Sequence, residues 1–172
     1  METGMHYLAY GSNLHPLRLT ERVPNACLIG TTELRGYKLA FHKLSVDGSA
    51  KCTLHCTTDA DDIAYAAVYF VPDNEIAVLD AIEGVGKGYD KAHFSVEIDG
   101  AALDIFTYIA SITHLVFDLS PYDWYQRLVL AGARYHDFPA PYIDSIAAAP
   151  RSQDEDARRR MANESLLARI DG

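Results

Sequence analysis

The sequence predicts an α+β fold, a small mixed but mostly antiparallel β-barrel with short flanking helices. Most of the segments with strand patterns precede most of the segments with helix patterns, and a hairpin lies near the middle of the chain. This order differs from the regular alternation of strand and helix that produces a parallel sheet. The length of 172 residues and the hydrophobic content of 49% suit one domain with a single core.

The first half of the chain contains most of the predicted strands. Residues 5–10 are apolar enough for a central strand, which the turn at residues 11–13, Gly-Ser-Asn, ends. Pro16 is suited to the first position of a short helix that runs to about residue 23, because an N–H would have no partner there. Turn-rich segments separate four further strands, which we expect at residues 27–32, 37–41, 50–57 and 63–71.

The middle of the chain is expected to form a helix and a β-hairpin. The helix opens at Asp73, its candidate N-cap, and Gly84 ends it after Glu83. Residues 89–98 and 101–109 then pair as a hairpin, because the two residues between them, Asp-Gly, are typical of a tight turn.

The last part of the chain is predicted to be helical. Residues 120–123, Ser-Pro-Tyr-Asp, open a helix that runs to about residue 132, and a short helix follows at residues 141–148. The charged segment 151–172 suits an amphipathic helix, docked or frayed. Its main apolar residues are Met161, Leu166, Leu167 and Ile170. We therefore divide the chain into a domain of residues 1–150 and this helical tail.

Composition and charge limit the classes of protein to which the chain could belong. The formal net charge of −9 disfavours nucleic-acid binding and anionic membranes, because both need a basic surface. No segment approaches the roughly 20 apolar residues of a membrane helix, and the N-terminus lacks the features of a signal peptide. We expect a cytoplasmic protein, monomer or homodimer, that binds a small molecule.

The three cysteines predict neither a disulfide framework nor a metal site. An odd, low count fits a reducing compartment. Cys52, His55 and Cys56 are close in sequence, but they lie in a predicted strand, where His55 points away from both cysteines. We therefore expect no metal ion.

The turn after the first predicted strand is one candidate for a functional site. Gly11 allows a ligand to approach the backbone closely, and successive N–H groups in such a turn can bind an anion. An ordinary connection between strand and helix has the same residue types. The pattern alone leaves both interpretations open.

Glu83 is the other candidate. On a helical wheel, Ile76, Val78, Leu79 and Ile82 fill one arc, and Glu83 falls near its edge. Glu83 is also the last residue of the predicted helix, at the negative end of the dipole. Both features disfavour the charged form of the carboxyl group, and a general acid/base needs such a raised pKa. Because Glu83→Gln removes a charge that burial disfavours, we expect the variant to be as stable as the parent or more stable. A carboxylate at the rim that reaches solvent is the alternative.

Three blocks of sequence together resemble the γ-glutamylcyclotransferase-like superfamily. Residues 7–14, Tyr-Leu-Ala-Tyr-Gly-Ser-Asn-Leu, resemble its opening signature. Residues 79–84, Leu-Asp-Ala-Ile-Glu-Gly, followed by Gly-Tyr at 88–89, resemble its catalytic helix and exit loop. Its C-terminal block is matched by Tyr125, Gly-Ala at 132–133, Phe-Pro at 138–139 and Tyr-Ile at 142–143. The segment after Pro150 lies outside the resemblance.

The resemblance implies a β-barrel enzyme that needs no metal or organic cofactor. In this family the free α-amine of a γ-glutamyl group attacks its own γ-carbonyl carbon, so that 5-oxoproline forms and an amine or amino acid leaves. The nucleophile is tethered to its target. By the matching position, Glu83 would be the catalytic acid/base, taking a proton from the α-ammonium group and giving one to the leaving amine.

The matching positions also imply a set of substrate-binding residues. The backbone of residues 11–14 would donate hydrogen bonds to the oxyanion or to the substrate α-carboxylate, two roles that the sequence leaves open. The aromatic positions would line the pocket. The full set is Tyr10, Gly11, Ser12, Asn13, Leu14, Tyr89 and Tyr125.

The leading interpretation is a γ-glutamyl cyclotransferase that acts on a γ-glutamyl amino acid. The alternatives are a cyclotransferase for a γ-glutamylamine or another γ-glutamyl metabolite, and a non-catalytic binding protein on the same fold. Glu83 favours an enzyme, because a pure binding protein needs no buried acid.

Overall fold

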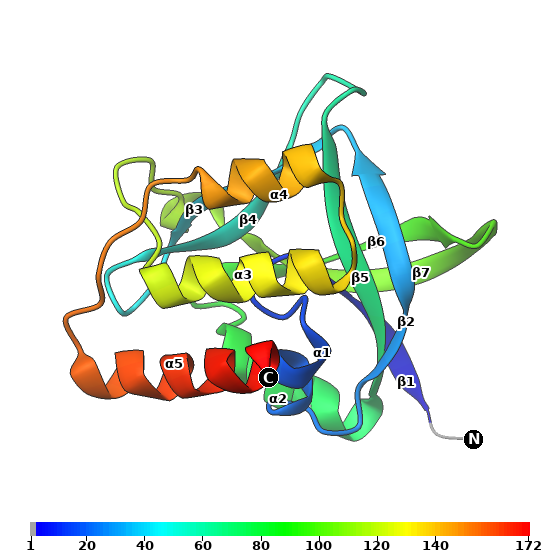
Figure 1. The fold of residues 1–172 in the computed structure, drawn as a ribbon. Coiled ribbons are helices and arrows are strands. Elements are labelled where there is room, and N and C mark those ends of the chain that lie inside the picture. The colour runs from blue at the N-terminus through cyan, green and yellow to red at the C-terminus, as the bar shows by residue number, and fades with distance from the viewer. Residues whose placement is uncertain (1–2) are drawn as a thin grey trace.

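The structure is a computed structural model that describes residues 3–172, and its strands form a curled sheet and a hairpin (Figure 1). The strands of the sheet are β1 (Gly4–Ala9), β2 (Cys27–Arg35), β5 (Ile63–Pro72), β6 (Tyr89–Ile98) and β7 (Ala101–Ala110), and the hairpin consists of β3 (Tyr37–Leu44) and β4 (Ala50–Cys56). The order in the sheet is β2-β5-β1-β7-β6, and only β1 and β7 pair in parallel. The predicted α+β fold with a mixed, mostly antiparallel sheet is confirmed.

The five-stranded sheet is a half-barrel. Its edge strands β2 and β6 approach each other where Thr32 Oγ1 donates a hydrogen bond of 2.9 Å to the carbonyl oxygen of Glu97. No backbone ladder joins these two strands within the described residues. The β3–β4 hairpin is fixed to β7, because the N–H of Ala110 donates to Thr53 Oγ1 at 3.0 Å. The predicted barrel is therefore only partly closed.

The centre of the core lies where β1 pairs with β5. Leu8 faces Val68 and Ala9 faces Ala67 in the antiparallel register, and all four side chains are fully buried. Apolar residues at consecutive positions are typical of strands that are covered on both faces. As a result, β1 carries the chain through the interior, and the turn that follows it begins inside the protein.

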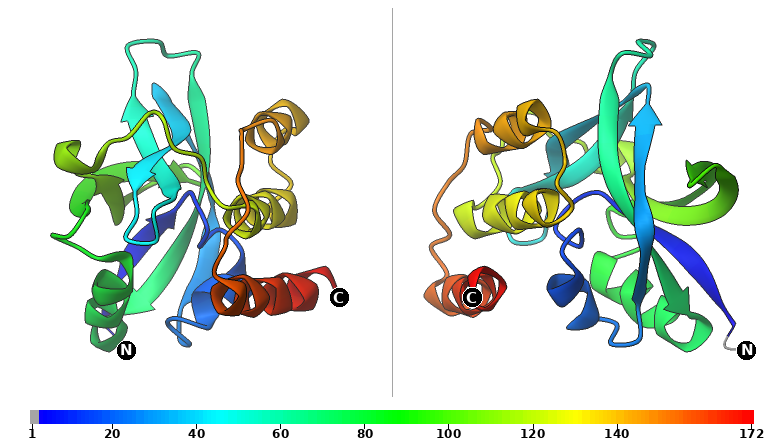
Figure 2. Two further views of the ribbon diagram at one scale, coloured as in Figure 1. Left: turned by 90° about the vertical axis from the view of Figure 1, so that its left-hand side faces the viewer. Right: turned by 45° about the vertical axis from the view of Figure 1, so that its right-hand side comes forward.

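Residues 3–172 contain five α-helices, and α3, α4 and α5 stand on one side of the strands (Figure 2). The helices are α1 (Pro16–Thr20), α2 (Asp73–Glu83), α3 (Asp123–Tyr135), α4 (Ala140–Ala147) and α5 (Ala157–Asp171). Helix α3 packs against both α4 and α5. None of the helices in this part of the chain is long and apolar enough to span a membrane.

Some predicted helix ends are wrong by a few residues. Helix α1 ends at Thr20, although the chain continues in turns to Val23, whose N–H bonds to the carbonyl oxygen of Leu19 at 2.9 Å. Asp73 is the first residue of α2 and not its N-cap, because the last residue with an extended backbone before the helix is Pro72 (φ −60°, ψ 147°). Helix α3 begins at Asp123 and runs beyond residue 132 to Tyr135.

The buried face of α2 also differs from the predicted one. Val78 and Ile82 are 47% and 44% exposed, whereas Glu75 is only 8% exposed. The carboxylate of Glu75 accepts hydrogen bonds from the backbone and side-chain amides of Asn25, which compensate its burial. The inward line therefore runs through Glu75, Leu79 and Glu83 at a spacing of four, and Glu83 lies on it instead of at its edge.

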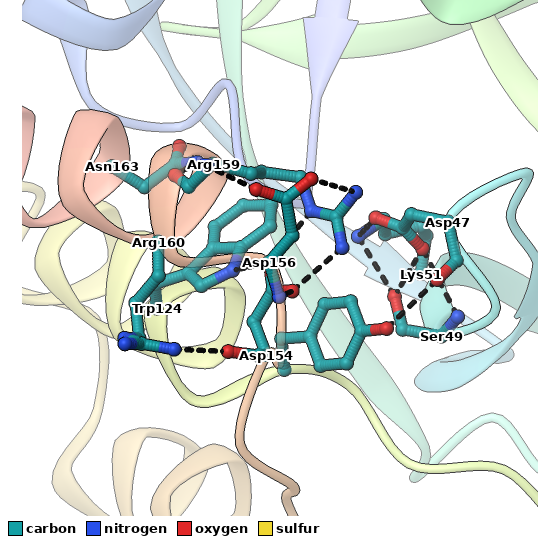
Figure 3. Close-up of polar contacts among 10 residues, drawn as sticks. Asp47, Ser49, Lys51, Trp124, Asp154, Asp156, Arg159, Arg160 and Asn163 are labelled. Carbon is teal, nitrogen blue, oxygen red and sulfur yellow. Dashed lines mark hydrogen bonds and ion pairs between the residues drawn. The ribbon is translucent and has the colours of Figure 1, made fainter.

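The C-terminal tail is docked through both apolar and polar contacts. Leu166 and Leu167 of α5 are 2% exposed, whereas Met161 is 69% exposed and is wrong as a predicted anchor. Asp154 precedes the helix, is 1% exposed, and accepts hydrogen bonds from Trp124 Nε1 at 2.8 Å and Arg159 Nε at 2.6 Å. Figure 3 shows this cluster beside the turn between β3 and β4, with Asp47, Ser49 and Lys51. The tail is therefore docked and not frayed, and the division at residue 150 remains a prediction.

Candidate active site

The residues predicted for the site come together at the end of β1, although they belong to distant parts of the sequence. The turn after β1, the C-terminus of α2, the start of β6, strand β4 and the first turn of α3 all reach one cavity. Its lining consists of Tyr7, Tyr10, Gly11, Ser12, Asn13, Cys52, Glu83, Tyr89, Tyr108 and Tyr125. Of the predicted set, only Leu14 is absent from this lining.

Leu14 fixes the turn at residues 11–13 through its buried side chain and its carbonyl oxygen. Its side chain is fully buried, and its carbonyl oxygen accepts a hydrogen bond from Tyr69 Oη at 2.7 Å. Gly132 of α3 lies directly against it, since a Cβ atom added to Gly132 would be 2.3 Å from Leu14 Cβ. The glycine therefore lets α3 approach the turn closely, and Leu14 fixes the turn without lining the cavity.

The turn itself presents backbone donors to the cavity. The N–H of Leu14 closes it by bonding to the carbonyl oxygen of Gly11 at 3.1 Å. The N–H groups of Gly11, Ser12 and Asn13 have no hydrogen-bond acceptor among residues 3–172. Three neighbouring donors without partners suit an oxyanion or a carboxylate.

Glycine is required at position 11 because there is no room for a side chain, and not because of its backbone conformation. A Cβ atom added there would lie 2.9 Å from Cys52 Cβ and 3.5 Å from Tyr125 Oη. The turn is thus pressed against β4. Any larger residue must push the backbone donors away from their present positions.

The carboxylate of Glu83 is held by only one of its oxygens. Oε1 accepts hydrogen bonds from Asn13 Nδ2 at 2.8 Å and from Arg22 Nη1 at 2.7 Å. Oε2 has no partner within the described residues, and the side chain is 16% exposed. The group is therefore fixed in position while one oxygen stays available for proton transfer.

Arg22 is a site residue that the sequence pattern does not predict. It also donates to Asn13 Oδ1 at 2.9 Å, so the side chain of Asn13 connects the turn at residues 11–13 to both Arg22 and Glu83. The positive charge of Arg22 makes an ion pair with Glu83, so the carboxylate is not isolated among apolar side chains as the helical wheel suggests. Arg22 lies in the turn after α1, so no helical spacing marks it as a site residue in the sequence.

The tyrosines around the cavity have their hydroxyl groups engaged. Tyr89 Oη donates to the carbonyl oxygen of Cys52 at 2.5 Å, and Tyr125 Oη accepts from the Cys52 N–H at 3.0 Å. Tyr10 Oη donates to the carbonyl oxygen of Tyr108. Tyr108 Oη donates to Asp80 Oδ1 at 2.6 Å, and neither Tyr108 nor Tyr7 is among the predicted residues. The rings are thus held in fixed orientations.

Burial removes these groups as alternative bases or nucleophiles at neutral pH. It raises the pKa of Tyr10, Tyr89 and Tyr125 well above the ordinary value, with smaller effects from neighbouring groups that include the charge of Glu83. Burial likewise raises the pKa of the Cys52 thiol to about 12. Cys52 therefore stays a neutral thiol, which is a poor nucleophile.

The other members of the cysteine cluster point elsewhere. Cys56 is exposed, and His55 pairs with His42 through ring nitrogens 2.9 Å apart. Nowhere in residues 3–172 are three His, Cys, Asp or Glu side chains grouped so that they could hold a metal ion.

Comparisons with known proteins concern the family and the fold of the chain. The sequence model of a family described as "Gamma-glutamyl cyclotransferase, AIG2-like" matches residues 7–126. A solved structure named "Gamma-glutamyl cyclotransferase" has a TM-score of 0.82 at 21% identity, covering 97% of this chain and 99% of its own. An uncharacterized human protein reaches 0.78 at 22% identity, again covering 97% of this chain and 99% of its own. No curated protein sequence matches the chain significantly.

One more distant structure shares the fold. It is described as a γ-glutamyl cyclotransferase specific to glutathione from yeast, and it has a TM-score of 0.53 at 13% identity. The aligned regions cover 98% of this chain and 96% of the yeast protein. At these identities the likenesses show a common fold.

Proposed function

The chain belongs to the gamma-glutamyl cyclotransferase, AIG2-like family, and from this premise we propose that it is a γ-glutamyl cyclotransferase that converts a γ-glutamyl amino acid to 5-oxoproline and the free amino acid. Glu83 is the acid/base, and Tyr10, Gly11, Ser12, Asn13, Tyr89 and Tyr125 surround the substrate, with Leu14 supporting the turn. The protein acts in the cytoplasm as a monomer or homodimer.

The reaction begins with proton transfer from the substrate α-ammonium group to Oε2 of Glu83. The freed amine attacks the γ-carbonyl carbon of the same molecule and closes a five-membered ring. The negative charge that develops on the carbonyl oxygen accepts hydrogen bonds from the unpaired N–H groups of the turn at residues 11–13.

Collapse of the intermediate completes the reaction. The bond between the γ-carbon and the leaving nitrogen breaks, and Glu83 returns a proton to that nitrogen. Glu83 then takes the second proton from the attacking nitrogen as the lactam forms and passes it to the released amine, which leaves as an ammonium group. Because nucleophile and target belong to one molecule, the residues need only orient them and move protons, and no cofactor is required.

The observation that carries the proposal is the state of Glu83. Asn13 and Arg22 hold one carboxylate oxygen, and the other oxygen has no partner in residues 3–172, beside three backbone donors that also lack acceptors. Burial keeps the surrounding tyrosines and Cys52 neutral, so the carboxyl group of Glu83 is the remaining proton-transfer group among the lining residues.

A panel of substrates tests the proposal. The purified protein is incubated with γ-glutamyl amino acids, γ-glutamylamines and glutathione, and 5-oxoproline is measured by mass spectrometry. We expect 5-oxoproline from γ-glutamyl amino acids. Product from γ-glutamylamines alone would favour the alternative enzyme, and no product from any compound would favour a binding protein on the same fold.

A further inference from the structure

A lysine near the end of β3 packs against the loop that joins α2 to β6. Nζ of Lys43 lies 4.6 Å from the centre of the Tyr89 ring, and Tyr89 is part of the cavity lining. The preceding residue is equally close, since a Cβ atom added to Gly88 would lie 2.8 Å from Lys43 Cε and 3.0 Å from Nζ. Lys43 is not itself a lining residue and borders the cavity through Tyr89.

A β-bulge in the β3–β4 hairpin precedes this lysine. The ladder with β4 passes on β3 from Phe41 directly to Lys43, while the partners on β4 are consecutive, so His42 is an extra residue. Bulges increase the local twist and redirect side chains, and they are frequent next to active sites. The local backbone of β3 is therefore adapted at the point where Lys43 meets the wall of the cavity.

The ammonium group of Lys43 lacks a carboxylate partner, although the residue is only 7% exposed. Nζ makes no hydrogen bond or ion pair within residues 3–172. The buried side-chain atoms without a partner in this part of the chain are Arg18 Nε and Tyr142 Oη, so Nζ of Lys43 keeps some contact with solvent. An anion that enters from solvent can therefore reach the ammonium group.

Lys51 shows how the chain satisfies such a lysine elsewhere at the same cavity. Its Nζ lies 4.6 Å from the centre of the Tyr125 ring, which is another part of the lining, and 2.8 Å from Asp47 Oδ2. An aromatic ring and a carboxylate together stabilise this ammonium group. Lys43 has the ring of Tyr89 but no carboxylate of the chain.

We propose that Lys43 binds a carboxylate of the γ-glutamyl substrate, an inference that rests on the proposed cyclotransferase function. A γ-glutamyl amino acid carries two such groups, one on the glutamyl half and one on the leaving amino acid. The unpaired backbone donors at residues 11–13 are neutral, and the charge of Arg22 is already used in its ion pair with Glu83. Lys43 supplies the positive charge that strengthens hydrogen bonds to a carboxylate.

Two pairs of compounds distinguish the two carboxylates. γ-Glutamylalanine and γ-glutamylethylamide differ only in the leaving carboxylate, because ethylamine is alanine without that group. 5-Oxoproline and 2-pyrrolidinone differ only in the carboxylate of the glutamyl half. The kcat and KM for 5-oxoproline formation are measured with the first pair, and dissociation constants for the second pair are measured by NMR titration.

The variants are Lys43→Met, Lys43→Arg and Lys87→Met. Methionine keeps much of the apolar stem of the lysine and removes the charge, whereas arginine keeps the charge. Lys87 is the control, because it is exposed in the same loop as Gly88. Thermal unfolding confirms that each variant is folded.

We expect Lys43→Met to lose about tenfold in kcat/KM, mainly through KM, or in affinity for the compound that has the carboxylate, which corresponds to about 1.4 kcal/mol of binding. A loss confined to γ-glutamylalanine assigns the contact to the leaving carboxylate. A loss on both substrates, with weaker binding of 5-oxoproline but not of 2-pyrrolidinone, assigns it to the glutamyl carboxylate. Lys43→Arg should recover part of the loss, and Lys87→Met should match the parent.

Unchanged kinetics and binding in Lys43→Met would overturn the inference. Losses that are equal within both pairs would overturn it as well, because Lys43 would then act on the fold or on a group other than a carboxylate. A parent that forms no 5-oxoproline from any γ-glutamyl compound but binds 5-oxoproline through Lys43 would overturn only the proposed function. A parent with neither turnover nor binding would overturn both.

Discussion

The ion pair between Arg22 and Glu83 reverses the expectation from the helical wheel and predicts that Glu83→Gln destabilises the fold. Nη1 and Oε1 are 2.7 Å apart, and the side chains are only 20% and 16% exposed, so solvent screens the pair less than a surface pair. Glutamine keeps an oxygen that accepts from Asn13 and Arg22 but loses the charge. A hydrogen bond to a charged group contributes about 1.5–3 kcal/mol and a neutral one about 0.5–1.5 kcal/mol. The free energy of unfolding should therefore fall by about 1 kcal/mol, which lowers Tm by about 2–4 °C.

A double-mutant cycle measures this effect directly. Urea unfolding at pH 7 of the parent, Glu83→Gln, Arg22→Met and the double variant should give a coupling energy of about 1 kcal/mol. The exposed pair Glu33–Arg35, with side chains 48% and 64% exposed, is the control and should show almost no coupling. A coupling between Arg22 and Glu83 below about 0.3 kcal/mol, or a Glu83→Gln protein more stable than the parent, would refute the reasoning.

Three further predictions follow from single contacts. Gly11→Val should abolish turnover in a folded protein, because its Cβ would overlap Cys52 Cβ, and an unchanged KM and kcat would remove the turn from the site. Cys52, with a pKa of about 12, should resist iodoacetamide at pH 8 in the native state while the two exposed cysteines react; rapid labelling of Cys52, detected by peptide mass spectrometry, would contradict this. The hydrogen bond from Arg159, followed by that from Trp124, lowers the pKa of Asp154 to about 2, so its stabilising effect should be present above the unfolded pKa of about 3.9 and be lost as pH falls through about 2. Asp154→Asn should lack this loss in acid urea titrations, and a variant with the parental pH profile would show that Asp154 plays no such part.

Local turn chemistry makes several elements predictable from the sequence. The Asp99-Gly100 pair adopts positive φ angles of 51° and 79°, as a tight hairpin turn requires. Gly84 has a φ of 74° and ends α2 in the left-handed conformation. In both places the residues involved are adjacent in the chain, so the pattern contains the information that determines the structure.

Features that depend on distant residues are not predictable in the same way. The helical wheel predicts that Val78 and Ile82 are buried, but both are exposed. It does not predict the burial of Glu75, because the hydrogen-bond partner Asn25 lies in another part of the chain. Arg22 reaches Glu83 with a long side chain from the turn after α1, a segment that the helical wheel of residues 73–83 does not include.

The cavity as a whole combines both kinds of information. Tyr10, Glu83 and Tyr125 were identified through a family resemblance, and the structure places all three around one cavity. Tyr7 and Tyr108 join them only because β1 and β7 are neighbours in the sheet. Sequence spacing alone would not bring these strands together.

The most direct measurement of the central claim is the turnover of Glu83→Gln. With γ-glutamylalanine at saturation, 5-oxoproline formation per folded molecule should fall by roughly 10²-fold or more, the usual effect of losing a general acid/base, with a residual rate from the tethered amine. Glu75→Gln is the matched control, because it removes a buried carboxylate from the same face of α2 outside the cavity, and it should retain near-parental turnover per folded molecule. A folded Glu83→Gln protein that forms 5-oxoproline at the parental rate would contradict the assignment of Glu83 as the catalytic acid/base.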